Sequence, residues 1–356
     1  MSPRRSVATF FMAAMSALFM TAQSQAQAPD LGKFVVVDAG SGIQYFLPTL
    51  AKDLGYFEEE GLDVEILVAG SGTDATAALI SGEADIIQTG LPHFIASNQQ
   101  GLQLWAIAPA IEAYTMSVVV ANEVLESAGV TPDSSLDEKM KGLAAANAKL
   151  GISRVGAGTD LFIQYVCLQT GVDCASDLQL MPLGAIGPTL AAFDQRQIVG
   201  YVRSHPDVDL GAARSNGTVL IAGSRGDVPS LKGSLYLMLG TSQRQIDERP
   251  EHLAAFLRGI GKAMKFVAAH PDEAREIGFR TVGKGIDKEI FDAAWKQTLP
   301  SFAQDPVIER SGVDTTFSVL AEIEGQAPEI DPEKVYRTDI ADAAWKAVAD
   351  FAPVVP

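Results

Sequence analysis

The chain has 356 residues, of which 47% are hydrophobic and 20% are charged, and its formal net charge is −17. This length predicts about two domains. An acidic chain repels nucleic-acid backbones and anionic membrane surfaces, so neither is expected as a partner. The chain has only two cysteines and four histidines, which excludes a disulfide-dense scaffold and disfavours a zinc site built from Cys and His.

The N-terminus has the pattern of an export signal. Arg4 and Arg5 precede an apolar stretch over residues 7–20, and small residues follow up to Ala26 or Ala28. This order is typical of a secretory signal peptide, and a run of about 14 apolar residues is short for a membrane span of about 20. We therefore predict a signal peptide over residues 1–26 and a periplasmic mature protein. An uncleaved anchor is the alternative.

After the signal, short apolar runs alternate with helical patterns that end at glycines. A helix over residues 74–81, for example, is stopped by Gly82. Strands that alternate with helices favour a parallel, doubly wound sheet. The predicted strands of this first series lie at 34–37, 62–68, 84–88 and 102–108.

A second series of the same kind follows, with predicted helices at 136–147, 160–170 and 187–196. After a further apolar run at 234–239, a long helix is predicted over 250–269, and the rest is mostly helical. The whole pattern predicts an α/β fold. The predicted strands of the second series lie at 116–120, 149–153, 178–183, 198–202 and 219–222.

Four loops rich in glycine and hydroxyl groups stand between a predicted strand and a predicted helix. The carboxyl ends of parallel strands share one edge of a sheet, where ligands bind, and free N–H groups at a helix start favour an anion. The alternative is that Ser71, Thr73 and Thr159 are ordinary N-caps. The four loops are residues 40–42, 70–73, 89–92 and 156–159.

Motifs of nucleotide binding and of nucleophilic catalysis are missing from the sequence. It contains no phosphate loop, no G-x-G-x-x-G and no G-x-S-x-G. The histidines have no ligand spacing. We therefore expect no cofactor, no metal site and no enzymatic activity.

The two cysteines flank the predicted end of a helix at Thr170-Gly171. A disulfide between Cys167 and Cys174 across that turn would suit an exported protein. Two buried thiols are the alternative.

Several other side chains at strand ends are candidates for a ligand site. Arg203 ends a predicted strand, where a guanidinium could bind a carboxylate or sulfonate through two hydrogen bonds; a surface ion pair with Asp207 or Asp209 is the alternative. His93 and His205 also follow predicted strands. Some aromatic residues near these ends are expected to line a pocket, while the others belong to the core: Tyr45, Phe94, Trp105, Tyr114 and Tyr201.

Residues 46–65, FLPTLAKDLGYFEEEGLDVE, resemble the opening signature of the periplasmic substrate-binding proteins for sulfonates, taurine, nitrate and thiamine-precursor pyrimidines. The resemblance continues through residues 70–92 and, more weakly, through 156–171, 191–194 and 200–206, and it fades in the last third. It implies a type II periplasmic-binding-protein clamshell of two doubly wound α/β domains. Domain I would comprise residues 29–115 and 232–356, domain II residues 116–231, and two hinge strands would lie near 114–118 and 231–236.

The resemblance also implies which positions contact the ligand, namely Ser41, Gly42, Ser71, Thr89, Gly90, Gly158 and Thr159. Asp160 departs from the family pattern and would either cap its helix or meet an amine. The complete candidate set adds Gln44, Tyr45, Thr73, Leu91, His93, Tyr114, Asp160 and Arg203.

The expected function is that of a solute receptor of an ABC importer, which closes its two lobes on a small organic anion. Its partners would be that small-molecule ligand and a membrane permease with its ATPase, and a monomer is expected. One alternative is a pyrimidine-binding or biosynthetic protein on the same fold, although the fungal synthases carry a cysteine-rich motif that this chain lacks. A ligand sensor for a signalling partner is the other alternative.

Overall fold

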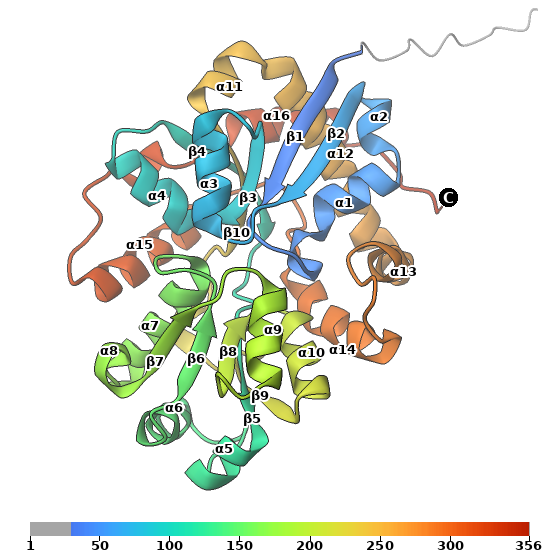
Figure 1. Ribbon diagram of the computed structural model, residues 1–356. Helices are drawn as coiled ribbons and strands as arrows, with labels where there is room; N and C mark the ends of the chain where they lie inside the picture. Colours follow the sequence, from blue (N-terminus) through green and yellow to red (C-terminus); the bar gives the residue numbers. More distant parts are fainter. Residues whose placement is uncertain (1–29, 356) are drawn as a thin grey trace, which may run out of the picture.

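The computed structural model describes residues 30–355, which form two five-stranded sheets with helices on their faces (Figure 1). The predicted signal peptide lies outside the described residues. We call each sheet, with the helices packed on it, a lobe. The first lobe holds the sheet β2-β1-β3-β10-β4, and the second lobe holds the sheet β7-β6-β8-β5-β9.

The first sheet is mixed, whereas the sequence pattern predicted a parallel sheet. Strand β1 pairs in parallel with β2 and β3, but β10 runs antiparallel to both β3 and β4. The reversal arises because the chain enters β10 from the second lobe, so that Leu237 starts beside Gly90, the last residue of β3. The strands are β1 (Gly32–Asp38), β2 (Leu62–Val68), β3 (Ile86–Gly90), β4 (Leu104–Ile111) and β10 (Leu237–Ser242).

The second sheet has the same arrangement. Strand β6 pairs in parallel with β7 and β8, and β5 runs antiparallel to β8 and β9. Ser117 therefore lies beside Arg203 and Ala222, at the edge that faces the first lobe. The strands are β5 (Ser117–Ala121), β6 (Lys149–Ile152), β7 (Gln179–Pro182), β8 (Gly200–Arg203) and β9 (Gly217–Ala222).

The helices begin and end at local signals. Ser71 caps α3 by accepting a hydrogen bond from the Asp74 N–H, and the helix ends at Gly82, whose φ of 84° suits glycine. Pro250 opens α12 and α13 begins at Pro271. On the first lobe lie α1 (Phe46–Asp53), α2 (Tyr56–Glu59), α3 (Gly72–Ser81), α4 (Leu91–Gln99), α11 (Gln243–Glu248), α12 (Pro250–Ala269), α13 (Pro271–Thr281) and α16 (Asp339–Ala347).

Helices also cover the second sheet, and two late helices reach both lobes. Helix α14 (Lys288–Thr298) contacts α13 and α10, and α15 (Arg310–Glu324) contacts α4 and α7 (Figure 1). The helices of the second lobe are α5 (Asn122–Ala128), α6 (Leu136–Ala145), α7 (Gly158–Thr170), α8 (Cys174–Asp177), α9 (Ile186–Asp194) and α10 (Asp207–Arg214).

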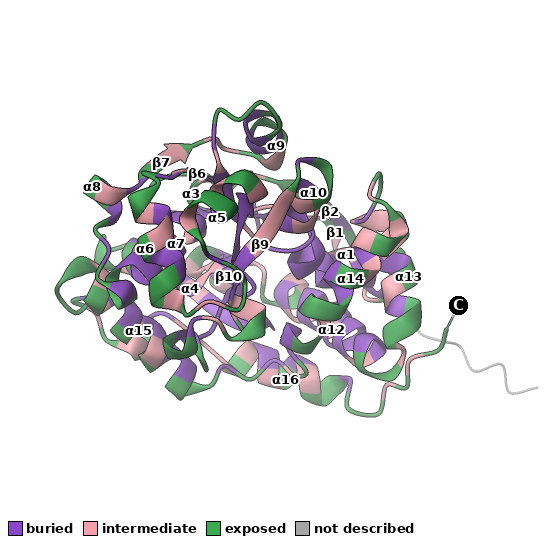
Figure 2. Cartoon of the chain, turned by 90° about the horizontal axis from the view of Figure 1, so that it is seen from below, coloured by how far each residue is buried: buried purple, intermediate pink, exposed green. Residues whose placement is uncertain are grey.

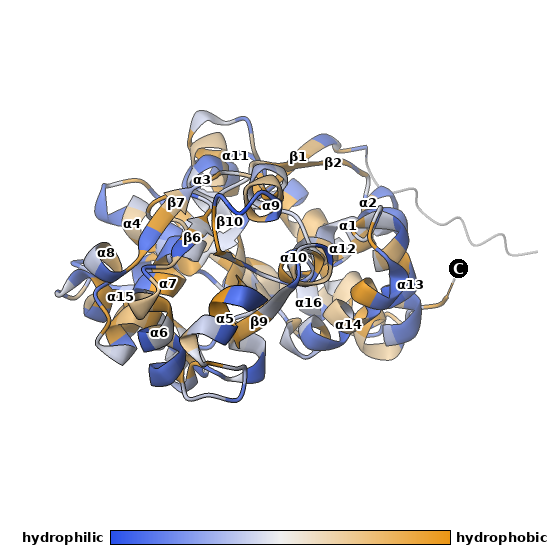
Figure 3. Cartoon of the chain, turned by 60° about the horizontal axis from the view of Figure 1, so that its bottom comes forward, coloured by the Kyte–Doolittle hydropathy of each residue, from blue (hydrophilic) through white to orange (hydrophobic). Residues whose placement is uncertain are grey.

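Apolar packing holds each lobe together. In the first lobe the fully buried rings of Phe57 and Phe256 stack with centroids 5.2 Å apart. In the second, Phe193 meets Tyr201 edge-on, also at 5.2 Å. The central strands are buried, the edge strands β2, β7 and β9 are only partly covered, and the outward helix faces are exposed (Figure 2). Hydrophilic residues accordingly follow the outside of helices such as α13 (Figure 3).

Two irregular connections join the lobes, one between β4 and β5 and one between β9 and β10. The predicted hinge strands at 114–118 and 231–236 lie here, but only residues 117 and 118 belong to a strand. Within the described residues, the Gly223 N–H of the second connection donates to the Met116 carbonyl of the first at 2.8 Å, and the Tyr236 N–H donates to the Ile111 carbonyl at the end of β4 at 3.3 Å. These separate bonds do not make a ladder between the connections. The predicted domain boundaries fall within these connections, and the division into two moving domains stays a prediction.

Cys167 and Cys174 form a disulfide that ties the end of α7 to the start of α8, with their Cα atoms 5.7 Å apart. Across residues 30–355, we find no helix whose length and hydropathy would let it cross a bilayer.

Candidate functional site

A cavity lies between the facing edges of the two sheets. Its walls come from the loops that follow β1, β2, β3, β6, β7 and β8, and from the two connections between the lobes. This placement follows from the sheet topology, because both sheets direct the carboxyl ends of their parallel strands toward this space.

Most of the predicted site residues line this cavity. The loops of the first lobe place hydroxyl and amide groups there, and the second lobe adds the start of α7 and the end of β8. Contact with a ligand stays a prediction for each of them. The predicted residues that line the cavity are Ser41, Gln44, Tyr45, Ser71, Thr89, Gly90, His93, Tyr114, Gly158, Thr159 and Arg203.

Four predicted residues do not line it. Leu91 is fully buried in the core of the first lobe, and Thr73 is exposed on the first turn of α3. Gly42 lies against the backbone of His205. The Asp160 carboxylate accepts the Gly156 N–H at 2.8 Å, so it stabilises the loop before α7. Each of the four residues is next to a lining residue in the sequence, but it does not itself line the cavity.

Other lining residues escaped the sequence analysis. Met116, Ser204 and Tyr236 lie in or beside the connections between the lobes, where no periodic pattern marks a site. Ser153 ends a predicted strand and could have been found by the same rule as Arg203. Five more lining residues lie within the four predicted loops without having been named singly: Gly40, Gly70, Gly72, Pro92 and Ala157. The remaining lining residues lie outside these loops and were not predicted: Ala39, Val68, Leu161, Ala185, Ile186, Asp207 and Leu237.

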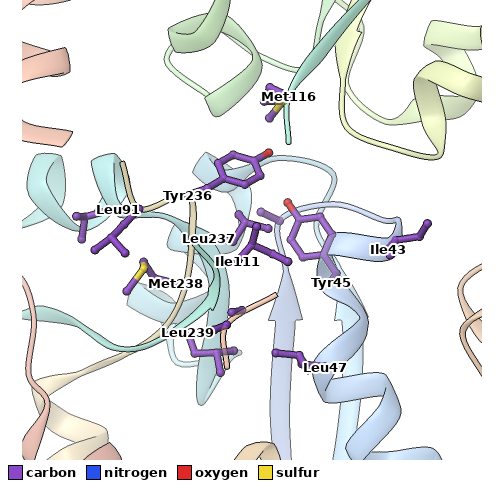
Figure 4. Packing of buried hydrophobic residues seen from close by; sticks show 14 of the residues in the cluster. Ile43, Tyr45, Leu47, Leu91, Ile111, Met116, Tyr236, Leu237, Met238 and Leu239 are labelled. Carbon is purple, nitrogen blue, oxygen red and sulfur yellow. The ribbon is translucent and has the colours of Figure 1, made fainter. Parts of the chain in front are cut away.

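The aromatic wall of the cavity comes mainly from tyrosines. Tyr114 and Tyr236, one from each connection, lie with ring centroids 4.8 Å apart. Figure 4 shows Tyr45 and Tyr236 at the edge of the first sheet, below Met116 of the second lobe. The Tyr236 hydroxyl lies 3.2 Å from Ser204 Oγ. Burial raises the pKa of Tyr236 to about 12, so this wall is uncharged at neutral pH.

Three titratable groups line the cavity besides these tyrosines: His93, Arg203 and Asp207. Burial lowers the pKa of His93 to about 4, so this imidazole is neutral at pH 7. Burial also raises the pKa of Asp207 to about 7, against the opposing effect of the Arg203 charge. Because a guanidinium stays protonated at all ordinary pH values, Arg203 supplies the permanent charge of the site.

Arg203 is directed into the protein rather than toward solvent. Its Nη2 donates to the Gly184 carbonyl and, at 3.4 Å, to Thr189 Oγ1, while Nε has no partner among the described residues. The alternative of a surface ion pair is not realised: Asp209 instead pairs with His205, Oδ2 to Nδ1 at 2.6 Å. His205 is thereby held outside the cavity lining.

Unpaired polar atoms in the first lobe complete the site. Thr89 Oγ1 and Gln44 Oε1 are buried without a partner among residues 30–355. Backbone N–H groups at the starts of α3 and α7 add donors. Such a set can hold a small polar molecule by several hydrogen bonds at once. Within the described residues, no cluster of three or more His, Cys, Asp or Glu side chains is arranged to hold a metal ion.

Solved structures share this fold. A protein from Bordetella bronchiseptica is similar with a TM-score of 0.74 and 23% identity, over 89% of this chain and 98% of that chain. The periplasmic nitrate-binding protein of Synechocystis is similar with a TM-score of 0.67 and 16% identity, over 92% and 93%. The chain therefore has the α/β periplasmic-binding-protein fold.

Curated relatives correct one expectation. The chain is 25% identical over 239 residues to a 4-amino-5-hydroxymethyl-2-methylpyrimidine phosphate synthase of Saccharomyces cerevisiae, and the match spans 65% of each chain. The expectation that this chain is not an enzyme is contradicted by this finding, because the relative is named as an enzyme. The missing motifs of nucleotide and nucleophilic chemistry did not exclude catalysis of another kind.

The match to a protein family covers both lobes. Residues 47–279 match the model of the NMT1-like family. This range includes most of the loops around the cavity, from Ser71 to Tyr236. The chain therefore belongs to the NMT1-like family.

Proposed function

We propose that the chain captures a small organic anion between its two lobes, as the extracytoplasmic solute-binding component of an ABC importer. The observation that carries this proposal is Arg203, which contributes a permanent positive charge and an unpaired Nε to a cavity whose histidine is neutral. A carboxylate or sulfonate is the natural partner of a guanidinium.

Closure of the lobes is the functional step in this proposal. Domain I comprises residues 29–115 and 232–356, and domain II comprises residues 116–231. A ligand that contacts loops of both lobes selects the closed state, because it binds that state more tightly than the open one. A membrane permease with its ATPase then receives the ligand from the periplasm. The similarity to a periplasmic nitrate-binding protein supports this role.

A second candidate function rests on the curated relatives. Their name as pyrimidine phosphate synthases favours a substituted pyrimidine or its phosphate as the molecule in the cavity, either as cargo or as the product of a reaction. The tyrosine wall formed by Tyr45, Tyr114 and Tyr236 provides flat apolar surface for such a ring.

Thermal unfolding with a panel of compounds tests both candidates. The panel contains nitrate, alkyl and aryl sulfonates, carboxylates, and 4-amino-5-hydroxymethyl-2-methylpyrimidine with its phosphate. A ligand at 100 times its Kd stabilises the folded state by about 2.7 kcal/mol, which shifts the melting temperature visibly. A shift with the unphosphorylated pyrimidine, and with no simple anion, contradicts the anion proposal and supports the second candidate.

Substitution of Arg203 then tests whether its positive charge binds the anion. We expect Arg203→Ala to weaken an anionic ligand by about 1.5–3 kcal/mol. The matched control is Arg196→Ala, which removes an arginine of the same lobe that pairs with Glu123 outside the cavity. Unchanged anion affinity in Arg203→Ala would contradict the proposal.

A further inference from the structure

Asp207 is a buried acidic residue of the cavity whose side chain has no partner among residues 30–355. It begins α10 and is only 9% exposed. Its backbone is fully engaged: the N–H donates to the Ser204 carbonyl at 3.0 Å, and its carbonyl accepts the Tyr201 hydroxyl at 2.6 Å. Asp207 lines the cavity, and no hydrogen bond or ion pair within residues 30–355 involves its carboxyl group.

Arg203 would be the natural ion-pair partner of this carboxyl group, but its guanidinium binds other groups. Arg203 lies near enough for its charge to oppose the effect of burial on Asp207. Its guanidinium nevertheless donates to Gly184 and Thr189 instead of forming an ion pair with Asp207. The second lobe thus presents one cationic and one acidic group separately to the same cavity.

Two separate groups of opposite charge restrict what the cavity can hold. When Asp207 is ionised, an anion without a hydrogen-bond donor satisfies Arg203 but leaves the acceptor atoms of Asp207 desolvated and unpaired, which is costly. A ligand that carries a donor as well satisfies both groups. His93 cannot take over this role, because the first lobe holds it against Gly72 and Thr89, on the opposite wall.

We propose that Asp207 determines specificity by accepting a hydrogen bond from the ligand, so that the cavity selects small anions that also carry an amino or hydroxyl group. The inference rests on the proposed function, since it takes the anion to lie beside Arg203. It adds a second required group to the ligand, at a place set by Asp207.

Matched pairs of anions test this inference by calorimetry at pH 8.5, where Asp207 is ionised. Each pair differs by one donor: ethanesulfonate against 2-hydroxyethanesulfonate and 2-aminoethanesulfonate, and benzoate against 3-hydroxybenzoate and 3-aminobenzoate. In the unmodified protein we expect at least one donor-bearing member to bind about tenfold or more tightly than its parent. The measured quantity is the ratio of the two Kd values, which cancels general effects on affinity.

Variants test whether this ratio of Kd values depends on Asp207. In Asp207→Ala the ratio should fall to about 1–2, and if this variant does not fold, Asp207→Asn should at least lower the preference for the amino member. The control Asp194→Asn, in which the affected carboxylate pairs with Arg214 outside the cavity, should keep the full ratio. A ratio near 1 in the unmodified protein, or one that Asp207→Ala leaves intact, overturns the inference.

The failures of the two proposals are distinguishable. Suppose that anions bind, that Arg203→Ala lowers their affinity, and that Asp207→Ala leaves the ratio of Kd values unchanged. Then only the proposed role of Asp207 is wrong. If no anion of either kind binds, the proposed function fails, and this inference fails with it.

Discussion

Arg154 Nε lies 2.9 Å from Asp74 Oδ2, and this ion pair joins the second lobe to the first. Arg154 follows β6, whereas Asp74 lies in the first turn of α3. The same carboxylate oxygen accepts a hydrogen bond from Ser71 Oγ at 2.7 Å, and Ser71 lines the cavity. The pair therefore connects the opposite lobes directly beside the candidate ligand site.

Removal of this ion pair should favour the open arrangement of the lobes. Both side chains are partly exposed, so the pair contributes about 0.2–1 kcal/mol. We expect Arg154→Gln to weaken ligand binding by about two- to fivefold and to increase the radius of gyration of the ligand-free protein in X-ray scattering.

A matched control separates closure from general electrostatics. Arg196→Gln breaks a similar pair, with Glu123, but within one lobe. It should change neither affinity nor radius. Equal effects of both variants would show that Arg154 does not act through closure.

The buried Asp207 should make folding stability depend on pH. Burial raises its pKa to about 7 in the folded protein, against about 3.9 in the unfolded chain. The folded state therefore binds more protons between these two values, and this contribution to stability is lost as the pH rises from about 4 through 7. The charged and titratable groups around Asp207 are Arg203, Asp209, Tyr45 and Tyr201.

Asp207→Asn resembles the protonated side chain and should remove this dependence. Relative to the unmodified protein, the variant should gain about 2–4 kcal/mol of unfolding free energy at pH 8 and little at pH 4.5. Denaturant titrations at the two pH values measure the difference. An equal gain in unfolding free energy at pH 4.5 and pH 8 would mean that Asp207 of the folded protein is ionised at both pH values.

The disulfide between Cys167 and Cys174 should stabilise the second lobe without shaping the site. It closes a short loop, with a sequence separation of 7, for which the chain-entropy model gives about 2–3 kcal/mol. It lies at the end of α7 opposite to Gly158 and Thr159, which line the cavity.

Thermal melts of the double variant Cys167→Ser/Cys174→Ser, with and without a reducing agent, measure this effect. The variant should melt lower and stay insensitive to the reductant, while its ligand affinity matches that of the unmodified protein. A large loss of affinity would mean that the disulfide positions the start of α7.

Gly72 should be required for the shape of the cavity. A Cβ atom at this position would lie 2.2 Å from His93 Nε2 and 2.6 Å from Thr89 Oγ1. Gly72→Ala should therefore displace His93 and weaken ligand binding by about tenfold or more, at a cost in stability of about 1–3 kcal/mol.

Gly187→Ala is the matched control, because it lies in the first turn of α9 with nothing within 4 Å of its Cβ position. It should leave affinity unchanged. Calorimetry measures the ligand affinity of both variants. Unchanged affinity in Gly72→Ala would contradict the prediction, because it would show that His93 moves aside without affecting the site.

Local signals in the sequence predicted most elements. The strand at 62–68 and the helix at 250–269 have the predicted bounds. Alternating polar and apolar residues mark the strand and a proline marks the start of the helix, and both signals lie within a few residues of the element. The direction of β10 was not predictable in this way. It depends on the edge at which the chain re-enters the first sheet, and that is a property of the whole topology.

The candidate site was predictable where it follows strand ends. Ser41, Ser71 and Thr89 were found because parallel strands bring their carboxyl ends together. Asp207 was considered only in the alternative that Arg203 forms a surface ion pair with Asp207 or Asp209, since neighbouring opposite charges often pair in solvent. Its burial depends on how α10 packs against the second sheet and α14, which residue spacing cannot reveal.

The position of β10 between β3 and β4 has a consequence for how the chain folds. The second sheet uses only residues 117–222, so it can form as soon as that continuous stretch is available. The first sheet stays split until residues 237–242 close the gap between β3 and β4. We therefore expect the lobe that begins the chain to be the last to acquire its native core, with β3 and β4 exposing unpaired edges in the meantime.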